Sequence, residues 1–134
     1  MRCLALRSDV PGIWRSLGVA FRNTGELYHS QRALEKAIEL QSSHAATHVD
    51  LGETMLQAEA PHAAAESADR AIGLNPNSAA AFGLKGRALV AMERYEEALP
   101  ILIQCHELGQ SDRSWRQPSQ QWIDDCRAAM DDSN

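Results

Sequence analysis

Apolar residues along this chain recur three and four positions apart, which is the spacing of one face of an α-helix. These sets come in pairs, and the pair returns 34 residues later. Three glycines and three leucines mark the interval most clearly, namely Gly18, Gly52, Gly86, Leu40, Leu74 and Leu108. A repeat of this length predicts an array of helical hairpins, which must stack on one another to bury a continuous core.

Residues between the apolar sets predict where the helices begin and end. Asp9, Ser43 and Asn77 share one place in the repeat, and each is expected to cap the first helix of a unit. Gly25 is expected to end a first helix in the left-handed conformation, and Pro61 to begin a second helix. The predicted units span residues 10–44, 45–78 and 79–112.

The repeated glycines Gly18, Gly52 and Gly86 fall inside first helices. Glycine costs about 1 kcal/mol relative to alanine in the interior of a helix. Because this cost recurs at one register, we expect a steric reason. The sequence predicts that a partner helix crosses each glycine so closely that no Cβ fits.

The period stops after Gly109. Residues 113–134 are predicted to form a polar linker and a capping helix, whose apolar face carries Trp122, Ile123, Cys126, Ala129 and Met130. Such a helix covers the last open face of an array and turns its polar side to water.

Residues 1–9 are expected to form a partial helix or an N-terminal stub, because Cys3 aligns with Ala37 and Leu6 with Leu40. Two helical turns can shield only part of the apolar face that carries Ile13, Trp14 and Leu17. An exposed apolar patch is typical of an interaction site. We therefore expect either a longer natural chain upstream or self-association through this end.

The repeated residues carry a resemblance to a known family. In the three units these residues are Trp14 to Phe21 with Ser30, Leu34, Ala37 and Leu40; Leu51 and Gly52 with Met55, Ala64, Ala68 and Ala71; and Phe82, Gly86, Leu89, Ala98, Leu102 and Leu108. Each set resembles a tetratricopeptide repeat (TPR). The resemblance implies an all-α, right-handed α-α superhelix of three TPR hairpins plus a C-terminal capping helix.

Composition limits the possible functions. The net charge of −5 argues against nucleic-acid binding, which usually requires a basic surface. No apolar run approaches the roughly 20 residues needed to span a bilayer, so no membrane association is expected. Three cysteines without metal-like spacing indicate free thiols in a reducing compartment, and therefore a cytoplasmic protein.

Candidate chemistry is sparse. His44 and His48 lie four residues apart, as two metal ligands on a helix would, but no third ligand is in register and we predict no metal. Cys105 takes the place of Ala37 and Ala71, which favours a packing role over a nucleophile. No catalytic triad or phosphate-binding loop is present, so we expect no cofactor and no enzymatic activity.

In the resembled family, the first helices of successive hairpins line a concave surface that binds a ligand. Transferring this geometry by register gives a set of candidate contact residues: Arg15, Val19, Arg22, Asn23, Val49, Asp50, Glu53, Leu56, Gly83, Leu84, Arg87 and Val90. Apolar residues recur in this set in every unit, which favours a groove for a peptide or helix. The alternative is that these are only the exposed sides of three helices. We expect the arginines Arg22 and Arg87 to affect binding with little effect on stability.

Some TPR domains bind the terminal carboxylate of chaperones through a basic and amide clamp. The corresponding places here hold Arg15, Val19, Asp50, Ala80 and Leu84. Because Asp50 would repel a carboxylate, the sequence argues against this mode.

The sequence thus predicts a noncatalytic scaffold or adaptor that binds a protein partner through the concave face. Two alternatives remain open. The chain could be the TPR segment of a larger enzyme, such as a transferase or a hydroxylase, used for targeting or substrate docking. It could also be a self-assembling structural protein.

Overall fold

A computed structural model describes residues 10–132, and this part of the chain contains helices and no strands. The helices are α2 (Pro11–Asn23), α3 (Leu27–Leu40), α4 (Ala45–Gln57), α5 (Pro61–Leu74), α6 (Ala79–Ala91), α7 (Tyr95–Gln110) and α8 (Ser119–Asp132). The expectations for residues 1–9, including the cap at Asp9, lie outside the described residues.

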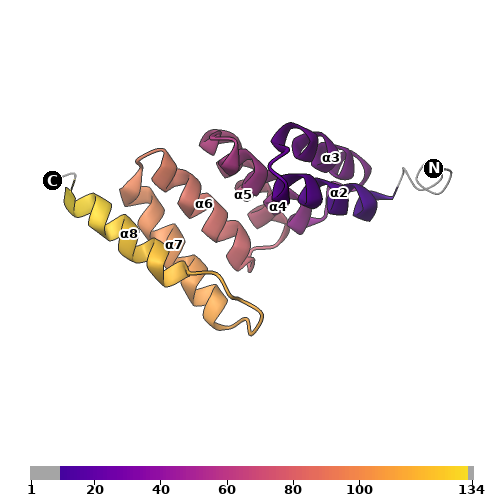
Figure 1. Ribbon diagram of the computed structural model, residues 1–134. Coiled ribbons are helices and arrows are strands. Elements are labelled where there is room, and N and C mark those ends of the chain that lie inside the picture. The colour runs from indigo at the N-terminus through magenta and orange to yellow at the C-terminus, as the bar shows by residue number, and fades with distance from the viewer. Residues whose placement is uncertain (1–9, 133–134) are drawn as a thin grey trace.

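The helices form three antiparallel hairpins, α2–α3, α4–α5 and α6–α7, followed by the single helix α8. The hairpins stack side by side from the N-terminal to the C-terminal end of the molecule (Figure 1). The second helix of one hairpin packs on the first helix of the next, as α3 does on α4 and α5 on α6. The first helices α2, α4 and α6 also contact one another in sequence. This arrangement confirms the all-α repeat superhelix.

The predicted caps Ser43 and Asn77 are each wrong by one residue. Helix α4 has His44 at its N-cap with no side-chain cap bond, and helix α6 has Ser78, whose hydroxyl accepts from the Ala81 amide at 3.1 Å. Asn77 instead lies in a turn, where its amide donates to Asn75 Oδ1 at 3.1 Å. The side chain that forms this turn bond is that of Asn75, which accepts from the backbone N–H two residues on, as asparagine commonly does in turns.

The turn within each hairpin uses the left-handed backbone conformation. Gly25 has φ +84°, as expected, and Glu59 and Glu93 at the same place in the repeat have φ +60°. A glutamate pays a steric cost in this conformation that glycine does not. The turn geometry is therefore repeated even where the sequence does not signal it.

The repeated glycines lie at close helix crossings, which confirms the steric prediction. A Cβ built on Gly18 would overlap Leu34, and one built on Gly86 would overlap Leu102, in both cases on the second helix of the same hairpin. Each glycine therefore allows a leucine of the facing helix to pack against its backbone.

In the middle hairpin, the residue that packs against the repeated glycine comes from a different helix. Ala68 stands where the other two hairpins have Leu34 and Leu102. The space beside Gly52 is instead filled by Leu84 from helix α6 of the next hairpin. Leu84, Ala64 and Ala68 belong to one buried cluster, in which each is 0% exposed. The core is thus continuous across the boundary between two hairpins.

Helix α8 packs on α7 and touches α6, as expected for a capping helix. Ile123 and Cys126 are buried in a cluster with Leu89, Ala98 and Leu102. None of the helices in residues 10–132 is long and apolar enough to cross a membrane.

Candidate functional site

The first helices α2, α4 and α6 are linked to one another by ion pairs. We call the side of these helices that carries the pairs the first-helix face. Arg15 Nε on α2 donates to Asp50 Oδ2 on α4 at 2.6 Å. Glu53 on α4 is bound in the same way by Arg87 on α6. All four of these residues belong to the set that the sequence predicted.

Asp50 is held by two arginines of α2, the first helix of the preceding hairpin. Arg22 Nη1 lies 3.6 Å from Asp50 Oδ1 and donates to the Asp50 carbonyl oxygen at 3.0 Å. The hydroxyl of Thr54 donates to the same carbonyl at 3.1 Å and lies 2.9 Å from that of Ser30 on α3. The Asp50 side chain is only 12% exposed. This carboxylate therefore fixes α2 against α4 and is not a free charge.

Arg87 makes a similar junction between α4, α6 and α8. Its guanidinium donates to both carboxylate oxygens of Glu53, with Nη1 3.2 Å from Oε2. Its Nε donates to the Gly83 carbonyl oxygen at 3.2 Å. The guanidinium carbon also lies 4.5 Å from the centre of the Trp122 ring, in a cation–π contact.

Trp122 was not predicted to lie near these residues. A Cβ on Gly83 would come within 2.9 Å of its ring and within 3.0 Å of Cys105 Sγ, so the missing side chain of Gly83 makes room for it. The Trp115 ring meets the Trp122 ring edge-on, with centres 6.4 Å apart. Trp122 of α8 thus covers Gly83, which is buried and therefore cannot belong to an open surface. The long linker breaks the 34-residue register, so no sequence alignment could place Trp122 here.

Leu84 is also wrongly assigned by the sequence. It is 0% exposed and fills the space beside Gly52, so it cannot contact a partner. Its register mate Asp50 lies at the equivalent interface between the first and second hairpins, where it pairs with Arg15 of α2. Position 68 holds alanine where the other two hairpins hold leucine, and Leu84 fills the space beside Gly52 that a leucine fills in those hairpins.

The remaining predicted residues lie at or near the surface. Val19, Val49, Leu56 and Val90 are half-buried, and Asn23 is exposed. Val49 and Leu56 rest on the core cluster that contains Leu84, whereas Val90 rests on the cluster under α8. The face thus combines apolar side chains supported by the core with charges that are already paired.

These ion pairs predict an effect of charge reversal on stability, contrary to the sequence expectation for Arg22 and Arg87. Arg87→Glu should lower the free energy of unfolding by about 1–3 kcal/mol, because it sets two carboxylates together in a partly buried position. The double swap Glu53→Arg with Arg87→Glu should recover most of the loss. Thermal denaturation of the three proteins checks this, and equal stability of parent and Arg87→Glu would contradict it.

Two of the residues weighed for chemistry, His48 and Cys105, are buried in the structure. The ring of His48 is buried, and its Nε2 lies 2.8 Å from the Ser42 carbonyl oxygen, so this nitrogen carries the proton and donates. Among residues 10–132 no group of three His, Cys, Asp or Glu side chains could hold a metal ion. Burial raises the pKa of the Cys105 thiol to about 11, against a smaller lowering by Arg87. A neutral buried thiol agrees with the packing role.

Comparisons with known proteins agree with this architecture. Residues 12–44 match the family model for the tetratricopeptide repeat. The Sgt2 TPR domain from Aspergillus fumigatus is similar with a TM-score of 0.84 at 15% identity, covering 92% of this chain and 81% of that one. No curated protein sequence matches the chain.

Two further similar structures are TPR domains in complexes. The first TPR of Spaghetti (RPAP3) bound to the HSP90 peptide SRMEEVD has a TM-score of 0.82 at 14% identity, covering 90% of this chain and 95% of that one. The TPR2B domain of yeast Sti1, in a pHsp70 complex, has a TM-score of 0.81 at 17% identity, with coverages of 92% and 98%. At these identities the likeness shows the fold.

Proposed function

Because the chain carries a tetratricopeptide repeat at residues 12–44 and has the fold of TPR domains, we propose that it is a noncatalytic protein-interaction module. It acts as a scaffold or adaptor that binds a peptide or a helix of its partner on the first-helix face. The cytoplasm is the proposed location, in keeping with the buried free thiols of Cys105 and Cys126.

One observation carries this proposal. The first-helix face presents Val19, Val49, Leu56 and Val90 as half-buried apolar side chains on three neighbouring helices. The ion pairs between the helices fix their spacing before any ligand arrives, so little ordering is needed on binding. A preformed surface with apolar anchors and a polar surround suits a peptide or an amphipathic helix.

The ligand we propose is not a free terminal carboxylate. The RPAP3 domain bound to an HSP90 peptide and the Sti1 domain in a pHsp70 complex support peptide binding by this fold. In this chain, however, Arg15 is already paired with Asp50, and Leu84 is buried. The charges at these places therefore offer no open clamp, and the apolar side chains carry the recognition.

Affinity capture with surface variants tests the proposal. Val19→Glu combined with Val49→Glu should remove captured partners, because each adds a charge in the middle of the apolar surface. Leu74→Glu is the matched control, since Leu74 is exposed on the second helix α5. Each variant is first checked for an unchanged helical circular dichroism spectrum. Partners retained by the double variant, or lost equally with Leu74→Glu, would contradict the proposed surface.

A further inference from the structure

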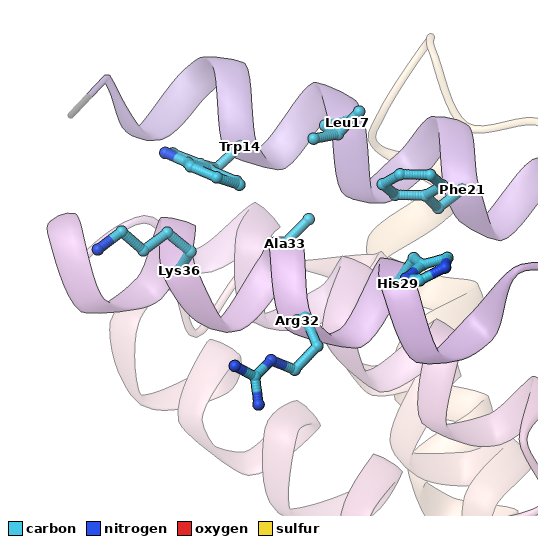
Figure 2. A pocket seen from close by; sticks show the side chains of 7 residues that line it. All are labelled: Trp14, Leu17, Phe21, His29, Arg32, Ala33 and Lys36. Carbon is cyan, nitrogen blue, oxygen red and sulfur yellow. The ribbon is translucent and has the colours of Figure 1, made fainter. Parts of the chain in front are cut away.

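A second surface lies at the N-terminal end of the array, on the first hairpin. We call it the end-face hollow. It has a volume of about 300 Å³ and is lined by Trp14, Leu17, Phe21, His29, Arg32, Ala33 and Lys36 (Figure 2). Trp14, Leu17 and Phe21 extend from α2 toward α3, and the other four belong to α3. The hollow lies outside the first-helix face, so it is independent of the proposed function.

The repeat shows what kind of element fits such a place. In the second hairpin the equivalent positions of Trp14, Leu17 and Phe21 are His48, Leu51 and Met55. Those three residues are 4%, 9% and 9% exposed, because helix α3 of the preceding hairpin packs on α4. In the first hairpin Trp14, Leu17 and Phe21 are only half-buried. A helix laid on α2, as α3 is laid on α4, would complete the same packing.

The charges of the hollow identify the occupant more closely. None of the residues lining it is acidic, although the chain as a whole carries a net charge of −5. Arg32 makes no hydrogen bond or ion pair with any described residue. Lys36 lies 3.7 Å from Glu39, but these side chains are 41% and 71% exposed, so that pair binds the lysine only weakly. An incoming helix therefore meets an apolar floor beside two available cations.

A second copy of this chain does not match these features. Symmetric pairing of two end faces would set Arg32 and Lys36 of both copies against each other. Helix α8 of another copy offers the exposed acids Asp124, Asp125 and Asp131, but it has no large exposed apolar side chain. Residues 1–9 contain Arg2 and Arg7 but only one acid, Asp9. The net charge of this segment is therefore positive, like that of Arg32 and Lys36, and does not complement the hollow.

We propose that the end-face hollow is a docking site for an acidic amphipathic helix of a partner protein. Apolar residues spaced three and four apart on that helix pack on Trp14, Leu17 and Phe21. Carboxylates along one of its edges pair with Arg32 and Lys36. The self-association that the sequence predicts for this end is thus replaced by binding of a different protein.

Fluorescence anisotropy with designed peptides tests this site. The probe is a labelled peptide of about 18 residues, long enough to form a helix, with leucines on one face and glutamates beside them. A second peptide has lysine in place of each glutamate. The full chain should bind the acidic peptide roughly tenfold or more tightly than the basic one, because charge complementarity selects between them.

Variants of the chain locate the binding. Arg32→Glu with Lys36→Glu should weaken the acidic peptide roughly tenfold or more and strengthen the basic one. Arg70→Glu is the matched control, because Arg70 is exposed and takes the place of Lys36 in the second hairpin. Val19→Glu, on the first-helix face, should also leave peptide binding unchanged. It thereby separates this proposal from the proposed function.

Three results would overturn the proposal. The first is equal binding of the acidic peptide by the parent and the Arg32→Glu, Lys36→Glu variant. The second is binding that occurs only after residues 1–9 are deleted, which would make that segment the occupant. The third is a dimer in sedimentation that Trp14→Glu dissociates, which would make a second copy the occupant.

Discussion

Gly52→Leu should lower the free energy of unfolding by about 3 kcal/mol or more, at the upper end of overpacking effects. The reason is the position of Leu84, which occupies the space where a side chain at position 52 would begin. Leu84 is fully buried, so it cannot turn away into solvent. The Ala64 carbonyl oxygen lies 3.3 Å from the same point and closes the other side. Chemical denaturation measures the loss.

The same substitution at Gly73 is the matched control. Gly73 lies in helix α5, and a Cβ there would meet nothing within 4 Å. Gly73→Leu should therefore raise stability by up to about 1 kcal/mol through helix propensity. The two substitutions are chemically identical, and the account requires opposite signs. A Gly52→Leu protein as stable as its parent would disprove the close crossing.

Leu84→Ala should cost about 2–5 kcal/mol, because it opens a cavity in the core between the second and third hairpins. Alanine already stands at positions 64 and 68 of this cluster, so little nearby side chain can move in to fill the space. Thermal and chemical denaturation give the size of the effect, and the mean residue ellipticity shows whether the helices remain.

Val19→Ala provides the comparison for Leu84→Ala. Val19 is half-buried on the first-helix face, so its truncation should cost about 1 kcal/mol or less. Had Leu84 been a surface contact, as its register in the sequence suggests, both substitutions would have similarly small effects. If Leu84→Ala lowers the free energy of unfolding by less than about 1 kcal/mol, Leu84 is not a core residue and belongs to the candidate surface.

The sequence predicts the hairpin architecture because the cause of the repeat is local. Each unit needs a close crossing at the same place, and glycine marks that crossing at positions 18, 52 and 86. Turn chemistry was less predictable. Gly25 signals its left-handed turn, but Glu59 and Glu93 adopt the same backbone without any such signal. In those units the packing of two helices imposes a conformation that the residue itself disfavours.

The sequence predicted which charged residues lie on the candidate surface, but not how they interact with one another. Position in the repeat placed Arg15, Asp50, Glu53 and Arg87 on neighbouring helices, and the structure brings them together. Register could not show that these charges pair with one another, since each pair joins residues 34 or 35 positions apart in different units. They help to set the spacing of the first helices, so a ligand meets a surface shaped by those pairs.

For Leu84 and Trp122, position in the 34-residue repeat does not predict the location of the side chain. The register treats each unit alike, but Ala68 in one unit changes the burial of Leu84 in the next. Trp122 follows a linker outside the repeat, and it reaches α6 because Gly83 has no side chain. Both outcomes depend on contacts between elements distant in sequence, which no single unit encodes.

The central claim is that a partner binds the first-helix face. Amide hydrogen exchange of the free and partner-bound protein tests it most directly, with a partner recovered by affinity capture. Protection should increase in peptides from α2, α4 and α6, around Val19, Val49 and Val90, and should change little in α3, α5 and α7. Protection confined to the second helices, with the first helices unchanged, would contradict the account.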